Sequence, residues 1–144
     1  MKHLLQLTAS CVILFVLAGC STLEPGKRHS NINLQELKRG YIVTPPNYNL
    51  TVSRYIGEAL IPRGVSIRAG AGETLPPDLD FLITYEDKWT WDLKMYLESL
   101  EIKFLNPTNR EVLASGSYHQ GVFHGYPDLQ QTVEDVIQSI YSAK

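Results

Sequence analysis

Two histidines in the last third of the chain are the residues best suited to acid–base or metal chemistry. His119 and His124 flank the sequence Gln-Gly-Val-Phe, and Asp128 follows shortly after them. Imidazole and carboxylate groups can bind a metal ion or exchange a proton near neutral pH. Their spacing does not match an H-E-x-x-H type of motif. We therefore expect exposed histidines on a glycine-containing loop, and a small metal-dependent hydrolase that uses His119 and His124 is the less favoured alternative.

Four carboxylates could supply acid–base pairs or a calcium site. They are Asp80, Glu86, Asp87 and Asp92. Both kinds of site need the carboxylates to converge, and no D-x-[DN]-x-[DN]-G loop is present to make them do so. We expect a solvated face, with Asp92 accepting hydrogen bonds at the corner into the next strand.

A serine nucleophile is not indicated either. The sequence Ser115-Gly116-Ser117 lacks the flanking glycines of a nucleophile elbow and lies within a predicted strand. We therefore predict a protein that is not an enzyme, with no catalytic residue, metal site or cofactor.

Two tryptophans form the strongest candidate for binding. Trp89 and Trp91 are two residues apart, so in a strand they share a face and could form an aromatic platform for a glycan, a peptide or a lipid headgroup. The alternative is that they cover the core or a sheet edge, where their indole N–H groups find partners. The candidate ligand- or partner-binding set is Trp89, Trp91, Asp92 and Tyr96.

The first residues have the organisation of a secretory signal. Lys2 and His3 precede an apolar run from Leu4 to Leu17, which ends in small residues before Cys20. The run is too short to span a bilayer, which takes about 20 apolar residues. The sequence Leu17-Ala18-Gly19-Cys20 resembles the bacterial lipobox.

That resemblance implies that residues 1–19 are a signal peptide and that Cys20 is acylated as the first residue of the mature chain. Two or three acyl chains anchor a protein stably, whereas one does not. Ser21 stands where lipoproteins retained in the inner membrane usually have Asp, so the resemblance favours the periplasmic face of the outer membrane.

Composition places the remainder among ordinary globular domains. Removing the first 19 of the 144 residues leaves 125, enough for one domain with a single core. The only cysteines are Cys11, in the signal peptide, and Cys20, so the folded domain has no disulfide and no Cys-based site. With a formal net charge of −2 and no clustered Lys or Arg, nucleic-acid binding is not expected.

The mature chain divides into a lipid anchor with a flexible tether, residues 20–39, and a single domain, residues 40–144. The tether is polar and contains Pro25 and Gly26. Apolar alternation predicts strands at 41–44, 65–68, 81–85, 91–105 and 112–118. The apolar residues between 91 and 97 are out of phase with those after 99, which indicates a bulge near Ser99. The turn residues 106–109 join the last two strands into a hairpin.

Two amphipathic helices complete the predicted elements. Asn49 can cap a helix over 50–61, and Asp128 can cap a second helix with an apolar stripe from Leu129 to Tyr141. The expected fold is α+β, a two-layer sandwich with a mainly antiparallel sheet of four to five strands and both helices on one face. If the opposite sheet face is apolar, the tether, a partner or a second copy must cover it.

One block resembles a group of small bacterial lipoproteins. It runs from Asp80 through Thr84-Tyr85 and Trp89-Thr90-Trp91-Asp92 to Tyr96-Leu97. The resemblance supports fold and location, and it implies no particular activity. We therefore expect a non-enzymatic binding or assembly module of the cell envelope that engages an envelope protein through a sheet face or edge. The alternatives are a module that binds peptidoglycan or lipid through Trp89 and Trp91, and the hydrolase named above.

Overall fold

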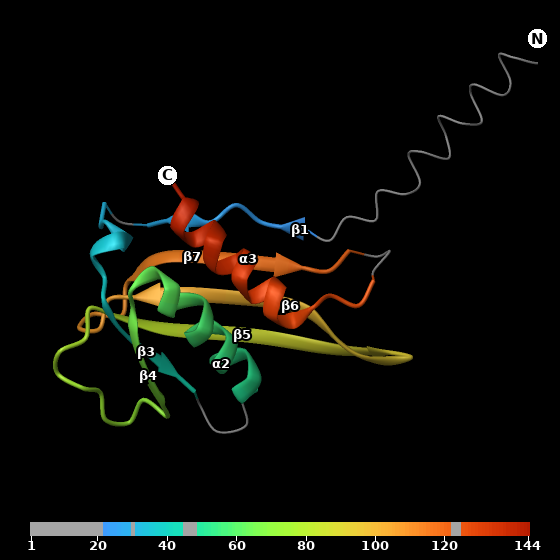
Figure 1. The fold of residues 1–144 in the computed structure, drawn as a ribbon, viewed down its shortest axis with the longest axis horizontal. Helices are drawn as coiled ribbons and strands as arrows, with labels where there is room; N and C mark the ends of the chain where they lie inside the picture. Colours follow the sequence, from blue (N-terminus) through green and yellow to red (C-terminus); the bar gives the residue numbers. More distant parts are fainter. Residues whose placement is uncertain (1–21, 30, 45–48, 122–124) are drawn as a thin grey trace, which may run out of the picture.

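The chain forms an open sheet with two helices, shown in Figure 1. The computed structural model describes residues 22–29, 31–44, 49–121 and 125–144. The elements are β1 Thr22–Leu23, β2 Lys27–Arg28, η1 Leu34–Glu36, β3 Arg39–Val43, α2 Leu50–Leu60, η2 Ile61–Arg63, β4 Ser66–Gly70, β5 Phe81–Asp92, β6 Lys94–Leu105, β7 Val112–His119 and α3 Leu129–Ser142.

The sheet is larger than the sequence indicates, and it is mixed. Over the described ranges it has seven strands, in the order β1-β7-β6-β5-β3-β4, with β2 also paired with β7. Four of its six pairings are antiparallel, but the sheet differs from the expected mainly antiparallel sheet of four to five strands in two respects. First, β3 pairs in parallel with both β4 and β5, because α2 and the loop after β4 carry the chain back before each next strand begins. Second, β1 and β2 add an edge to β7.

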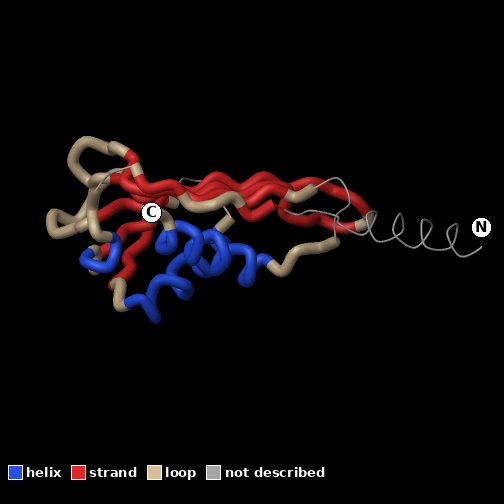
Figure 2. Tube along the Cα trace, turned by 90° about the horizontal axis from the view of Figure 1, so that it is seen from above, coloured by secondary structure: helices blue, strands red, loops and turns tan. Residues whose placement is uncertain are grey.

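The helices and the sheet form two layers, as expected for an α+β protein. Figure 2 shows α2 and α3 on the same side of the sheet. The core between the layers includes Phe81 and Phe104, whose ring centroids are 4.9 Å apart. The apolar stripe of α3 faces this core through Val133, Val136 and Ile137. Among the described residues, no helix is long and apolar enough to cross a bilayer.

Local sequence signals explain where the helices begin. The Asn49 side chain accepts a hydrogen bond from the backbone N–H of Thr51, and the Asp128 side chain accepts one from the N–H of Gln131. These caps satisfy N–H groups that have no partner within the helix. Both predicted caps and both predicted helices are confirmed, and α2 ends at Leu60 before the turn η2.

The strands also follow the predicted order, with different lengths. β5 lies between β3 and β6, and its first three residues are fully buried, as expected for a central strand. However, β5 continues to Asp92, seven residues beyond the predicted end at Tyr85. Trp91 and Asp92 therefore belong to β5 and not to the strand that follows, and Leu93 lies at the turn between β5 and β6.

A bulge in β6 explains why its apolar alternation changes phase along the strand. Trp89 pairs with Leu97 and Lys88 pairs with Ser99, so Glu98 is an extra residue on β6. Because of this extra residue, Leu97 and Leu100 both face the core, where each is 1% exposed. The bulge predicted near Ser99 is confirmed.

The second sheet face has an apolar part and a polar part. Tyr41, Leu82 and Leu105 form an apolar row across β3, β5 and β6, in which Leu82 is 0% exposed and Tyr41 8%. The bulge turns Leu97 away from this face, toward the helices. Two cross-strand rows on the open face have polar residues only, and they are Thr84, Lys103 and Ser115, then Glu86, Glu101 and Ser117. These two polar rows are stable in water without a cover.

The described part of the predicted tether lies against the domain. Leu34 and Leu37 are buried in the core, and β1 and β2 pair with β7. Between these two strands, Gly26 passes so close to the carbonyl oxygen of Ser139 in α3 that a Cβ would clash with it. The described residues of the predicted tether are therefore part of the fold and not a free spacer.

Candidate functional site

The β5–β6 hairpin extends past the other described elements, and it positions the two tryptophans. β7 ends at His119, opposite Ser99, so the hairpin beyond this row is a ribbon of two strands (Figures 1 and 2). Trp89 and Trp91 share the face of the ribbon that points to the helix side, because they pair with Leu97 and Met95.

The two tryptophans differ in their surroundings. The indole N–H of Trp89 donates to the carboxylate of Asp87, and the side chain packs against the core. Trp91 is 69% exposed. Trp89 therefore has the packing role that the sequence left open as an alternative, whereas Trp91 is available for contact.

The segment that precedes α3 braces the free edge of this ribbon. The hydroxyl of Tyr126 donates to the carbonyl oxygen of Asp92 at 2.7 Å, and the Tyr126 ring meets the Tyr96 ring edge-on at a centroid distance of 5.8 Å. The ammonium of Lys94 lies 3.8 Å from the centroid of the Tyr126 ring. Trp89 and Leu129 help to line a depression of about 330 Å³ here.

Sequence reasoning placed Asp92 and Tyr96 in the candidate set but missed Tyr126. Asp92 ends β5 before the turn into β6, and its backbone carbonyl accepts the bond from Tyr126, whereas the sequence suggested hydrogen bonds to its side chain. Tyr126 lies between a loop and a helix cap, where no periodicity marks a residue as packed. Only the fold brings it beside β6.

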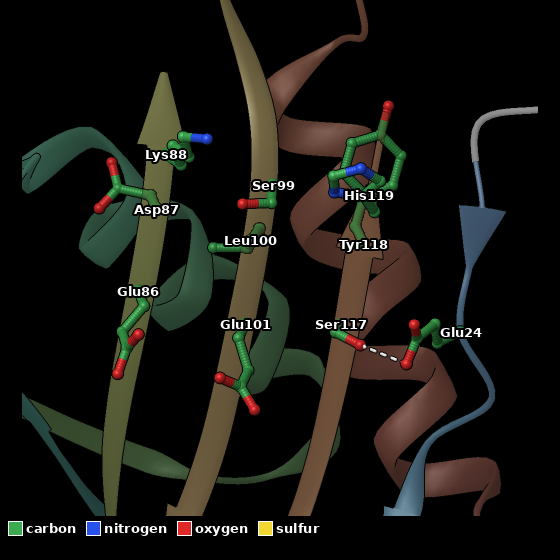
Figure 3. A pocket seen from close by; sticks show the side chains of 10 residues that line it. All are labelled: Glu24, Glu86, Asp87, Lys88, Ser99, Leu100, Glu101, Ser117, Tyr118 and His119. Atoms are coloured by element: carbon green, nitrogen blue, oxygen red, sulfur yellow. Dashed lines mark hydrogen bonds between the residues drawn. The ribbon is translucent and has the colours of Figure 1, made fainter. Parts of the chain in front are cut away.

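The open sheet face has a second, wider depression of about 460 Å³ (Figure 3). Glu86, Glu101 and Ser117 lie in register across β5, β6 and β7, and the Ser117 hydroxyl donates to Glu24 at 3.0 Å. Its carboxylates and hydroxyls can accept hydrogen bonds from a polar or cationic surface.

Charges on this face are partly paired. The ammonium of Lys103 lies 2.8 Å from a carboxylate oxygen of Glu101, and this bond raises the pKa of Lys103 above its ordinary value. Lys88 forms a 2.7 Å ion pair with Glu98, the bulge residue. Within the described ranges, no three His, Cys, Asp or Glu side chains gather as metal ligands would.

The four carboxylates considered for catalysis do not converge. Asp80 and Asp92 lie at opposite ends of β5, about 40 Å apart at the rise of an extended strand. Asp80 accepts from the backbone N–H groups of Lys38 and Arg39, each at 2.9 Å, and from the Arg39 guanidinium at 2.6 Å. The Arg39 guanidinium, with the two N–H groups, lowers the pKa of Asp80 to about 2. Asp80 therefore joins the start of β3 to the start of β5.

Of the remaining predicted residues, one lies in the described part of the chain and two lie outside it. His119 ends β7 and is exposed, at the rim of the depression in Figure 3. His124 and Cys20 lie outside the described residues. The structure thus brings Trp89 and Tyr96 together, and it places Trp91 at the exposed end of the same hairpin.

Comparisons with known proteins bear on this arrangement. No protein-family model matches the sequence, and no curated protein matches it. Among solved structures, the fold is similar to that of PelC. One dodecamer of a substituted PelC from Paraburkholderia phytofirmans aligns with a TM-score of 0.60 and 10% identity, over 85% of this chain and 98% of that chain. A PelC dodecamer from the same organism gives 0.59 and 8%, over 87% and 99%. At these identities the likeness to PelC concerns the fold alone.

Proposed function

We propose that this chain is a lipoprotein that acyl groups on Cys20 hold at the periplasmic face of the outer membrane. The observation that carries the proposal is the distance from the candidate lipid to the fold. Cys20 stands two residues before Thr22, which already pairs with His119 in the sheet. A domain attached so closely stays at the membrane surface, because two residues span at most about 7 Å.

At that surface the protein acts by binding and assembly and not by catalysis. The open face presents hydrogen-bonding groups without a converging set of catalytic residues among the residues described. The sheet also has two different edges, β4 on one side and β1 with β2 on the other. Sheet edges are natural sites for pairing with another chain.

The partner we propose is a second copy of the same chain. The PelC structures that share the fold are dodecamers, which supports assembly of this chain as well. A closed ring requires two different surfaces on each subunit, and the two unlike edges of this sheet meet that requirement.

The backbone of β4 offers a specific test. Ser66 donates to Lys38 and Gly70 accepts from Thr44, so residues 66, 68 and 70 bond to β3 while the N–H of Ala69 points outward. Ala69→Pro removes the outward N–H and leaves the bonds to β3 in place. Ala69→Val is the matched control, because it keeps the N–H group.

The experiment measures mass in detergent solution after extraction of the lipidated protein, with light scattering and with crosslinking in membranes. The proposal predicts a multiple of the monomer mass for the wild type and for Ala69→Val, and a smaller mass for Ala69→Pro. A wild type that is monomeric in both settings contradicts assembly, and capture of another envelope protein in its place would assign the edge to that partner.

The depression beside Trp89 and Tyr96 favours a second candidate function, the binding of peptidoglycan. Its aromatic walls suit the apolar face of a sugar ring. Titration of tryptophan fluorescence with soluble peptidoglycan fragments should then show saturation, and Tyr96→Ala should abolish it. An unchanged spectrum over the whole titration contradicts this function.

A further inference from the structure

The tip of the β5–β6 hairpin has three exposed apolar side chains. Trp91 is 69% exposed, Leu93 86% and Met95 53%. They follow one another at alternate positions around the turn, with Lys94 among them. An indole, two flexible apolar side chains and a lysine are the combination found where proteins meet the interfacial region of a bilayer.

The tip and the candidate acylation site lie at the same end of the sheet. Lys88, Ser99, His119 and Thr22 form one row across β5, β6, β7 and β1. β7 runs toward the tip end and β1 is antiparallel to it, so the chain enters β1 from the tip end, as Figure 1 shows. The N-terminal attachment and the exposed apolar groups therefore face the same way.

The hairpin tip and Cys20 extend beyond this row by distances that allow both to reach one membrane surface. Leu93 lies five residues beyond Lys88, which places the tip about 15 Å beyond the row. Cys20 can extend about 7 Å beyond Thr22 in the same direction. The difference of about 8 Å equals the depth to which apolar side chains enter the boundary between headgroups and acyl chains.

The backbone conformation of Leu93 independently indicates that the tip contacts something outside the domain. Leu93 has a φ of 59°, a conformation that glycine or asparagine adopts at lower cost than leucine. A leucine that is both strained and 86% exposed does not stabilise the domain by itself. Its side chain becomes useful only when something outside the domain covers it.

We propose that the hairpin tip is a second membrane contact, with Trp91, Leu93 and Met95 inserted into the interfacial region of the leaflet that holds the acyl chains. The inference rests on the proposed lipid anchor and adds to it. Acyl chains alone leave the domain free to rotate about its attachment. Two contacts fix its orientation, so that the ring-forming edges of neighbouring copies lie at the same height.

Quenching of tryptophan fluorescence by brominated phospholipids tests the insertion. The lipidated protein is reconstituted into phosphatidylcholine vesicles with bromine near the headgroup end of the acyl chains. Trp89→Phe leaves Trp91 as the only reporter, since the chain has two tryptophans. The control reporter is Ile61→Trp in a background without Trp89 and Trp91. Ile61 is 63% exposed and lies in η2. Hydrogen bonds from Lys38 link η2 to the start of β5, which is the end of the strand far from the tip.

The expected result is strong quenching of Trp91, at least about twofold, and little quenching of the reporter at position 61, since only the tip enters the interface. Leu93→Asn, which suits the left-handed backbone, should reduce the quenching of Trp91 while the far-ultraviolet circular dichroism stays unchanged. Equal quenching of both reporters, or none of Trp91, overturns the proposal. So does a blue shift of Trp91 that follows protein concentration without lipid, because a second copy then covers the tip.

Palmitate labelling of the same preparation separates this proposal from the lipid anchor. A labelled protein with unquenched Trp91 refutes the tip contact and leaves the anchor intact. An unlabelled protein whose Trp91 is still quenched by added vesicles refutes the anchor and supports the tip as a membrane contact of its own.

Discussion

Substitution of Asp80 by asparagine should destabilise the domain in a pH-dependent way. The carboxylate accepts three hydrogen bonds, two from backbone N–H groups and one from Arg39, and its side chain is 21% exposed. The pKa of Asp80 falls from 3.8 to about 2. Since one pKa unit corresponds to about 1.4 kcal/mol, the ionised carboxylate contributes about 2 kcal/mol to the free energy of unfolding, with some loss to solvent screening.

The sign of the pH dependence follows from the direction of the shift. The pKa of Asp80 is lower in the folded state, so this stabilisation is fully present above about pH 4 and is lost as the pH falls toward 2. Asp80→Asn should therefore be less stable than the wild type by about 2 kcal/mol at pH 7, and the two should converge near pH 2.

Urea unfolding followed by circular dichroism measures the difference at each pH, and taking the difference cancels the other carboxylates. Asp78→Asn is the matched control, because Asp78 also pairs with Arg68 and Arg39 but has a side chain that is 52% exposed. It should change stability less than Asp80→Asn. A constant difference between Asp80→Asn and the wild type from pH 7 to pH 2, or no difference at pH 7, would refute the reasoning.

Two further substitutions and one deletion test how the sequence produces the fold. Gly26→Ala should release β1 and β2 from α3, which faster proteolysis of residues 22–29 would reveal, whereas unchanged proteolysis would show that this segment is not packed. Deletion of Glu98 should cost about 2–3 kcal/mol in urea unfolding, since it turns Leu97 out of the core, and a stable deletion variant would mean that the bulge is dispensable. Asp128→Ala should lower stability by about 1 kcal/mol through loss of the cap on α3, and a thermal melt that does not shift would contradict that role.

Local signals in the sequence were sufficient for the helices and for the order of the strands. Asn49 and Asp128 have side chains that satisfy the first N–H groups of a helix, and the apolar stripe after Asp128 repeats at the helical period. The bulge at Glu98 was also visible, because an extra residue shifts the alternation of apolar side chains.

The sequence did not show which distant segments pair as strands. Whether β3 pairs in parallel with β5 depends on how the loop after β4 returns, and no residue pattern specifies that. β1 and β2 are two residues each, too short for an alternation, so a polar stretch with Pro25 and Gly26 was predicted as a tether. The backbone pairing with β7 and the close approach of Gly26 to α3 hold it in place.

For the candidate site, too, the sequence predicted some features and only the fold showed others. Alternation placed Trp89 and Trp91 on one face, but it could not show that Trp89 packs against the core while Trp91 is exposed. The sequence also could not show how far apart the carboxylates lie, and one strand separates Asp80 from Asp92 along its whole length.

Acylation of Cys20 is the claim on which the membrane location, the assembly at a surface and the second contact at the hairpin tip all depend. Metabolic labelling with palmitate, followed by membrane fractionation of the wild type and Cys20→Ala, measures it directly. The account predicts a labelled wild type in the outer-membrane fraction and an unlabelled Cys20→Ala protein that loses this fractionation. An unlabelled wild type, with Cys20→Ala fractionating in the same way, would contradict it.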